Sequence, residues 1–387
     1  MPNQLDSGKN SACLLPVVGV TGVRFAKLKK CINWGALMQQ KTITIAGRKV
    51  GPGHPALIIA EVAQNHDGSL GTAHAYIDAV ADMGADAVKF QTHIADAEST
   101  LDEPFRVKFS RQDDTRYAYW KRMEFTPEAW QGLAKHAAER GLIFLSSPFS
   151  VQAVELLSAL GTAAWKVGSG EIASPDLLEA MLTKRKPILL STGMSTYAEI
   201  ENFHNAVVSK GHELALFQCT SKYPVDLESV GLNCIETLRE RFQCPVGLSD
   251  HSGTPFPALA ALARGADLLE VHVTLSKRCF GPDVSASLTL EELSTLCNAR
   301  DAFHVMLTNP VDKDNMAAEL GSMRDIFRKS VCLSTSKPAG TILTREMLIL
   351  KKPGNGIPAK DIDKVLGKRL LRDCTSDRLL RWEDIDA

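Results

Sequence analysis

Short apolar runs alternate with longer amphipathic stretches from residue 57 to residue 274. The runs are rich in β-branched and other apolar residues, and the stretches between them are rich in alanine, leucine and glutamate and end at glycine or proline. Continuous apolar runs are typical of buried parallel strands, and amphipathic stretches closed by glycine or proline are typical of helices. The eight runs are Leu57–Glu61, Ala87–Thr92, Leu142–Phe149, Ala164–Ser169, Pro187–Thr192, Leu214–Thr220, Cys244–His251 and Leu268–Thr274.

This alternation predicts an α/β fold. Eight parallel strands over this length fit a (β/α)8 TIM barrel better than an open doubly wound sheet, and no G-x-G-x-x-G dinucleotide turn is present. Local signals also predict helix boundaries. Ser69–Met83 has apolar residues at helical spacing and stops at Gly84, and Thr126 followed by Pro127 marks the start of another helix.

One long polar and aromatic segment interrupts the alternation between the second and third strands. We call Leu101–Met123 the insertion. Because it follows the carboxyl end of a strand, it lies where a lid or a substrate-binding loop is expected. A solvated excursion without a role is an equally good interpretation.

The pattern divides the chain into four parts. Residues 1–40 are predicted to be a disordered extension, and 41–305 form the barrel domain. Residues 306–327 turn polar and resemble a linker, and 328–387 form a compact unit with short strands expected at Ser330–Cys332, Ile342–Ile349 and Lys368–Leu371. A unit of this size is near the lower limit for an independent core.

Composition excludes several classes of partner. The net charge is −1 in 387 residues, which gives no electrostatic reason to expect binding to nucleic acid or to an anionic membrane. The apolar segment 12–20 is too short to span a bilayer. The nine cysteines are scattered and show no C-x-x-C spacing, which is typical of a reduced, cytoplasmic protein.

Two histidines end consecutive predicted strands. His251 and His272 flank an alanine- and leucine-rich helical stretch, so both imidazoles are expected at the carboxyl edge where parallel α/β proteins bind ligands. A single histidine there would more often be a hydrogen-bonded core residue. Two that can converge on one point indicate a metal held by imidazole and oxygen.

Two lysines lie inside apolar strands. Burying Lys89 and Lys166 is costly unless each meets an anion, and hydroxyl residues end several neighbouring strands. This combination favours a phosphate monoester. For either lysine alone an internal salt bridge explains the burial, and a Schiff base on Lys166, as in barrel aldolases, is a competing functional interpretation.

Several motifs along the chain resemble those of a known family. In the barrel region they are A-E-V-A-Q-N-H-D-G-S (60–69), A-V-K-F-Q-T-H (87–93), S-S-P-F-S (146–150), K-V-G-S-G-E (166–171), L-S-T-G-M (190–194), C-T-S-K-Y-P (219–224), G-L-S-D-H-S (247–252) and F-G-P-D-V-S-A-S (280–287). The tail contains K-K-P-G-N-G-I (351–357). They resemble the sialic acid synthase (N-acetylneuraminate synthase) family, and the tail resembles its C-terminal antifreeze-like (SAF) domain.

The resemblance implies an enzyme that condenses phosphoenolpyruvate with a 2-acetamido sugar aldehyde, such as N-acetylmannosamine, and releases phosphate. It implies a divalent metal, Mn²⁺ or Mg²⁺, on His251 and His272, with His272 in the catalytic set beside Glu61 and Glu171. Phosphoenolpyruvate would be surrounded by Lys89, Ser147, Lys166, Ser169, Ser221 and Ser249. The sugar and the reacting centre would be faced by Glu61, Gln91, Glu171, Tyr223 and Asp283.

The resemblance further implies a domain-swapped homodimer, in which Lys352 of one subunit reaches the acceptor in the other. Two residues depart from the family pattern, since Ser221 replaces a common asparagine and Lys352 replaces an arginine. A 2,4-diacetamido-trideoxyhexose of the legionaminic or pseudaminic type is therefore an alternative acceptor. A phosphorylated aldose, and a carbohydrate- or ice-binding role for the tail, also stay open.

Overall fold

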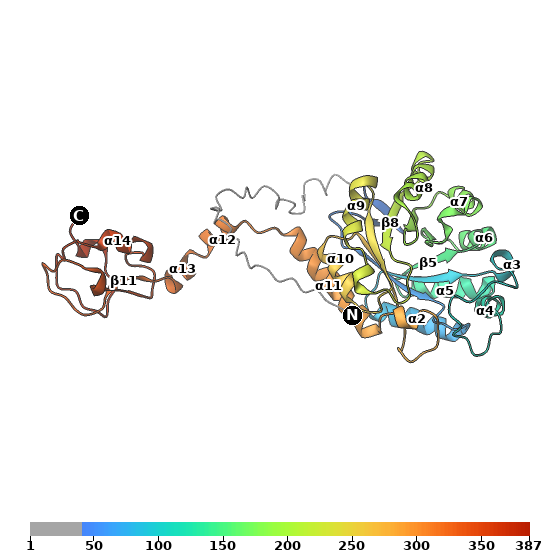
Figure 1. Ribbon diagram of the computed structural model, residues 1–387, viewed down its shortest axis with the longest axis horizontal. Helices are drawn as coiled ribbons and strands as arrows, with labels where there is room; N and C mark the ends of the chain where they lie inside the picture. The colour runs from blue at the N-terminus through green and yellow to red at the C-terminus, as the bar shows by residue number, and fades with distance from the viewer. Residues whose placement is uncertain (1–40) are drawn as a thin grey trace, which may run out of the picture. The chain divides into compact units, whose positions relative to one another are not determined.

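The computed structural model describes residues 41–387 and divides the chain into two compact units (Figure 1). The first unit ends at Met306, and the second runs from Leu307 to Ala387. The prediction of a disordered extension at residues 1–40 lies outside the described residues. Within 41–387, none of the helices combines the length and the apolar character needed to cross a bilayer.

Eight parallel strands form the centre of the first unit, as the sequence predicted. The sheet order is β5-β4-β3-β10-β9-β8-β7-β6, and β5 lies beside β6, which closes the barrel. The bounds are β3 Leu57–Ala63, β4 Ala87–Thr92, β5 Ile143–Pro148, β6 Trp165–Val167, β7 Ile188–Ser191, β8 Leu214–Cys219, β9 Val246–Asp250 and β10 Leu268–His272. The (β/α)8 fold is therefore confirmed.

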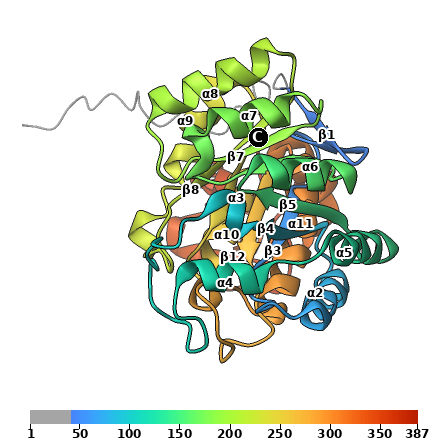
Figure 2. The ribbon, with the colours of Figure 1, turned by 90° about the vertical axis from the view of Figure 1, so that its right-hand side faces the viewer.

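The helices of the first unit surround the strands (Figure 2). Ser69 and Thr126 cap α2 and α5 through their side chains, as their positions in the sequence predicted. The bounds are α2 Leu70–Asp82, α3 Ala95–Glu98, α4 Arg116–Met123, α5 Pro127–Glu139, α6 Val151–Ala159, α7 Pro175–Leu182, α8 Tyr197–Ser209, α9 Asn233–Phe242, α10 Phe256–Ala263 and α11 Leu290–Thr308. Both α3 and α4 belong to the connection between β4 and β5 that contains the insertion.

A hairpin that the sequence interpretation missed precedes the barrel. Strands β1, Ile43–Ile45, and β2, Arg48–Val50, pair antiparallel. Their apolar side chains join the buried cluster formed by residues at the amino ends of the barrel strands, including Leu57 and Leu268. The hairpin thus covers the amino end of the barrel, and the carboxyl end is left for a site.

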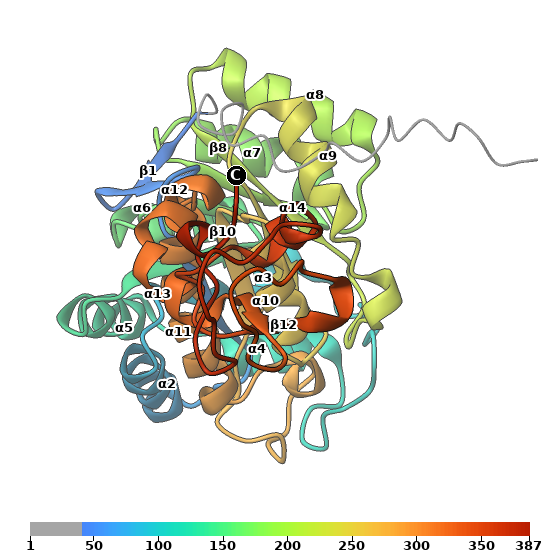
Figure 3. The ribbon, with the colours of Figure 1, turned by 90° about the vertical axis from the view of Figure 1, so that its left-hand side faces the viewer.

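The second unit is built from short elements (Figure 3). Its helices are α12 Lys313–Glu319, α13 Gly321–Phe327 and α14 Ile362–Val365, and its strands β11 Ser330–Leu333 and β12 Leu348–Lys351 pair antiparallel. The polar segment interpreted as a linker therefore contains two helices. The strand expected at Ile342–Ile349 is shorter and begins later, and the segment expected at Lys368–Leu371 forms only isolated bridges.

Backbone packing inside the barrel generates a stability prediction. A Cβ added at Gly247 of β9 would lie 2.0 Å from the carbonyl oxygen of Leu268 in β10. We expect Gly247→Ala to lower the free energy of unfolding by about 1–3 kcal/mol or more, because backbone atoms must move apart. Scanning calorimetry of the full chain measures this as a lower unfolding temperature.

Gly132 in α5 provides the matched control, because a Cβ there meets nothing within 4 Å. Gly132→Ala should raise stability by about 0.5–1 kcal/mol, the ordinary gain of alanine in a helix. Equal effects of the two substitutions would contradict the close approach of β9 and β10.

Candidate active site

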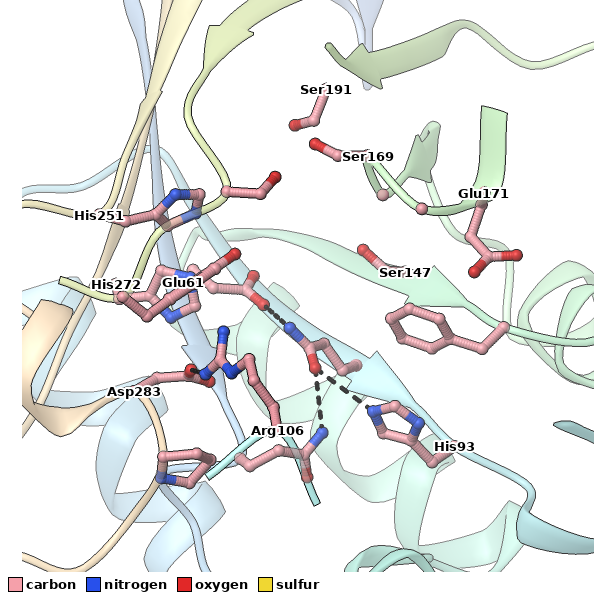
Figure 4. A pocket seen from close by; sticks show the side chains of 18 of the residues that line it. Glu61, His93, Arg106, Ser147, Ser169, Glu171, Ser191, His251, His272 and Asp283 are labelled. Carbon is pink, nitrogen blue, oxygen red and sulfur yellow. Dashed lines mark hydrogen bonds and ion pairs between the residues drawn. The ribbon is translucent and has the colours of Figure 1, made fainter. Parts of the chain in front are cut away.

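A cavity of about 640 Å³ opens at the carboxyl ends of the barrel strands (Figure 4). All eight strands contribute a side chain: Glu61, Lys89, Ser147, Lys166, Ser191, Cys219, Ser249 and His272. Every residue that the sequence placed in a site lines this cavity except Lys352, which belongs to the second unit. The insertion also lines it, which favours the substrate-loop interpretation over a solvated excursion.

Two buried lysines share one carboxylate at the floor of the cavity. The Glu270 Oε1 atom lies 3.6 Å from Lys89 Nζ and 3.4 Å from Lys166 Nζ. Lys89 Nζ also lies 2.5 Å from Glu61 Oε2. The sequence interpretation missed Glu270. Its signal was present, because Glu270 is a charged residue in an apolar strand, two positions before His272 and therefore on the same face.

The lysines and carboxylates set each other's protonation. Burial alone would raise the pKa of Glu270, but Lys166 and Lys89 lower it to about 2. Burial would lower the pKa of Lys89, but Glu270 and Glu61 raise it. For Lys166 burial prevails over Glu270, so its pKa is lowered. An additional anion beside Lys166 would stabilise its charged form.

Glu61 can exchange a proton near neutral pH. Burial raises the pKa of Glu61 to about 7, although the Lys89 ammonium acts in the opposite direction. Gln91 Nε2 donates a hydrogen bond of 3.0 Å to Glu61 Oε1. A carboxyl group whose pKa lies close to the working pH is suited to general acid-base catalysis.

Hydroxyl groups surround the two ammonium groups. Lys89 Nζ donates to Ser147 Oγ at 3.1 Å, and Lys166 Nζ donates to Ser191 Oγ at 2.6 Å. Gly193 N donates to Ser169 Oγ at 3.0 Å, and a Cβ added at Gly193 would lie 2.5 Å from Ser221 Oγ. Two positive charges with several short hydroxyl donors form a site for a phosphate or a carboxylate.

The two histidines lie together on one wall of the cavity. The ring centroids of His251 and His272 are 5.3 Å apart. His251 Nδ1 donates to the carbonyl oxygen of Thr220 at 3.0 Å, which leaves the Nε2 lone pair of His251 free. The Nδ1 atom of His272 is buried without a hydrogen-bond partner among the described residues. Burial lowers the pKa of both rings to about 3, with Lys89 adding to the effect on His272.

Neutral imidazoles with available lone pairs are the form that binds divalent metals, so the pair fits the predicted metal. Within residues 41–387, no group of three or more histidine, cysteine, aspartate or glutamate side chains is arranged to hold an ion. A metal on this pair would therefore take its other ligands from substrate and water.

The insertion contributes a cation to the same wall. The guanidinium of Arg106 lies 4.2 Å from the centre of the Tyr223 ring, and its Nη2 atom is 3.3 Å from Asp283 Oδ1. Burial raises the pKa of Asp283, although Arg106 opposes this. Arg106 was not predicted, since one arginine in a polar segment has no distinguishing signal. Glu171 lies on another side of the cavity and accepts from Ser174 Oγ at 2.9 Å.

Comparisons with known proteins show which families this chain resembles. Residues 76–312 match the NeuB family, and residues 328–386 match the SAF domain. The N,N'-diacetyllegionaminic acid synthase of Campylobacter jejuni is 34% identical over 331 residues, which cover 84% of this chain and 98% of that protein. The N-acetylneuraminate-9-phosphate synthase of Homo sapiens is 34% identical over 346 residues, which cover 88% and 95%.

One solved structure is also similar to this chain. The crystal structure of N-acetylneuraminic acid (sialic acid) synthetase from Leptospira borgpetersenii serovar Hardjo-bovis in complex with citrate is similar to this chain, with a TM-score of 0.65 and 28% identity. The match covers 74% of this chain and 96% of that one.

The shared carboxylate generates a prediction about coupling. Glu270→Gln should lower the free energy of unfolding by about 3–5 kcal/mol, because Lys166 loses its ion-pair partner while it stays buried. Adding Lys166→Met to this variant removes the unpaired charge and should recover most of the lost free energy of unfolding. Calorimetry of the two single variants and the double variant measures the coupling, and strictly additive effects would contradict it.

Proposed function

The chain belongs to the NeuB family, and on that premise we propose that it condenses phosphoenolpyruvate with a 2-acetamido sugar aldehyde to give a nonulosonic acid and phosphate. One observation supports this most strongly. The cavity joins a lysine pair suited to an enol phosphate with a pair of neutral histidines suited to a metal.

Phosphoenolpyruvate occupies the lysine half of the cavity in this proposal. Lys89 and Lys166 balance the charges of its phosphate and carboxylate groups, and the hydroxyls around them donate hydrogen bonds. The pKa of Lys166, which burial lowers, rises again when the dianion arrives, so binding fixes the proton on Nζ. Lys166 therefore acts as a charge and not as a Schiff base. The hydroxyl donors proposed here are Ser147, Ser169, Ser221 and Ser249.

The sugar lies on the histidine wall, near Gln91, Tyr223 and Asp283. His251 and His272 would hold a divalent ion, Mn²⁺ or Mg²⁺, which would supply Lewis-acid polarisation of the aldehyde oxygen. Gln91, Tyr223 and Asp283 hold the sugar so that its aldehyde carbon faces the methylene carbon of the enol phosphate. A carbon–carbon bond forms between these two carbons.

Water completes the reaction at the former enol carbon, which has become oxocarbenium-like. Glu61 or Glu171 takes a proton as the water oxygen bonds to that carbon, and the aldehyde oxygen gains a proton. The new hydroxyl oxygen then forms a carbonyl group as the carbon–oxygen bond to phosphate breaks, and phosphate takes the hydroxyl proton and leaves between Lys89 and Lys166. Glu61 is placed for proton exchange because its pKa lies at about 7.

A second acceptor class is favoured by the relatives. A 34% identical protein is named as an N,N'-diacetyllegionaminic acid synthase, and a 30% identical one from Campylobacter jejuni as a pseudaminic acid synthase. Ser221 and Lys352 depart from the pattern of N-acetylneuraminate synthases. A 2,4-diacetamido-trideoxyhexose is therefore the alternative acceptor. Ice or carbohydrate binding as the main role has no support from the cavity.

The arrangement of domains and subunits stays a proposal. We place the synthase domain at 41–305, the connecting segment at 306–327 and the SAF domain at 328–387. The proposal of a domain-swapped homodimer, in which Lys352 acts on the acceptor, rests on the resemblance to the family.

A phosphate-release assay tests the function. Purified full-length protein with phosphoenolpyruvate and Mn²⁺ should release phosphate with N-acetylmannosamine or a 2,4-diacetamido-trideoxyhexose, and mass spectrometry should find the nonulosonic acid. N-acetylmannosamine 6-phosphate and an aldose phosphate without an acetamido group complete the panel. Release with the last acceptor alone would overturn the proposed substrate class.

Metal binding is tested by removing one imidazole at a time. His251→Ala and His272→Ala should each lose the bound ion, because a two-histidine site weakens by several kcal/mol, on the order of 3, when one ligand is lost. Elemental analysis after dialysis measures this independently of turnover. His212→Ala is the control, because His212 precedes β8 at the opposite end of the barrel and does not line the cavity. Full metal content in either cavity variant would contradict the site.

A further inference from the structure

His93 lies at the edge of the cavity with both of its ring faces covered. It follows β4 and is buried. The ring centroid of Trp120, from α4 in the insertion, lies 3.9 Å away at 17°, and that of Phe149, after β5, lies 4.4 Å away at 6°. Stacking on both faces holds the imidazole in one plane. Its two nitrogens can then meet only what lies at the ring edge.

Both edge partners are hydrogen-bond acceptors. Nδ1 lies 2.5 Å from Glu98 Oε1. Nε2 lies 3.3 Å from Gln91 Oε1, and Figure 4 draws this contact as the dashed line at His93. The oxygen of Gln91 is identified by its surroundings, because Gln91 Nε2 donates to the Glu61 carboxylate and Gln64 Nε2 donates to Gln91 Oε1 at 3.2 Å. Nε2 of His93 therefore donates to Gln91 Oε1, and Nδ1 faces the Glu98 carboxylate.

The surroundings hold the ring in place. The Glu98 side chain is buried beside the Nδ1 edge, and Trp120 and Phe149 cover the two faces. The result is a continuous chain of contacts from Glu98 through His93 and Gln91 to Glu61.

We propose that His93 is a positioning residue for the acceptor half of the reaction. Held by Glu98 and by the two stacked rings, it donates from Nε2 to Gln91 Oε1 and so keeps the Gln91 amide group turned toward Glu61 and the sugar. The inference rests on the proposed function for what Gln91 and Glu61 do. It also gives the insertion a role, because Trp120 connects that segment to Gln91 through the stacked ring.

The contacts predict which kinetic constants change. His93 contacts Gln91, whereas Lys89 and Lys166 donate to Ser147 and Ser191, so the loss of His93 should affect the acceptor and not phosphoenolpyruvate. A residue that only supported the fold would disturb both substrates together.

Two substitutions at this position form a matched pair. His93→Phe keeps the stacking area but has no donor, whereas His93→Gln carries an amide N–H near the place of Nε2. In steady-state assays of the full chain, His93→Phe should raise the KM for the acceptor and lower kcat, together about tenfold or more in kcat/KM. The KM for phosphoenolpyruvate should stay within about twofold, and His93→Gln should recover part of the loss.

Glu98→Gln supplies a second test if His93→Phe does not fold. It replaces the carboxylate that holds Nδ1 with an amide of similar shape, so the same acceptor-specific loss is expected in weaker form. Unchanged acceptor kinetics in a folded variant, or an equal rise in both KM values, would overturn the proposal.

Nuclear magnetic resonance of ¹⁵N-histidine protein provides a readout that needs no turnover. With His93→Phe used to assign the signal, Nε2 of His93 should have the shift of a nitrogen that carries a proton, and Glu98→Gln should change the signal. An Nε2 without a proton in the wild-type protein would overturn the hydrogen bond to Gln91. Wild-type protein that shows this signal but releases no phosphate with any acceptor would refute the proposed function and the kinetic role, and would leave only the hydrogen bond.

Discussion

The placement of two ammonium groups around one carboxylate is the constraint on which the cavity depends. Lys89 and Lys166 are both buried, and moving an unpaired charge out of water costs several kcal/mol, on the order of 3–5. Glu270 lies within 4 Å of both, so it reduces the repulsion between them. One carboxylate does not balance two ammonium groups, and Glu61 is only partly ionised at neutral pH because its pKa is about 7. An anionic substrate completes the balance.

The barrel makes this arrangement possible by the register of its strands. His272 pairs with Glu61, and Glu61 pairs with Lys89, so a histidine, a carboxylate and a lysine stand side by side at one level. At the amino end, the hairpin of β1 and β2 fills the space beneath them with apolar side chains. Water therefore reaches the charges from the carboxyl end, where the cavity opens. The absence of a side chain at Gly193 lets Ser169 and Ser221 approach the same floor.

The two halves of the cavity differ in their chemistry. The lysine half consists of fixed charges and hydroxyls on strands. This suits phosphoenolpyruvate, which is the same substrate whichever acceptor is used. The acceptor half includes Arg106 and Trp120 from the insertion, and these residues are held by stacking and by an ion pair. Because the insertion is not part of the barrel, its sequence can change without disturbing the strands. Selection among amino sugars is therefore expected to depend on this half.

Much of the fold and of the site follows from the sequence alone. Continuous apolar runs are typical of buried strands, and eight of them predicted the barrel. Side chains that end parallel strands lie at one edge, which brought Lys89 and His251 into one cavity. Glu270 could have been found by the same period of two. The sequence pattern cannot show side chains that meet through loops. The contacts of Arg106 with Tyr223 and of Trp120 with His93 join residues from separate segments, and neither has a period along the chain. The pKa of Glu61 and the hydrogen bonds of His93 were likewise decided by the tertiary structure, because both depend on burial and on partners that only folding brings within a few ångströms.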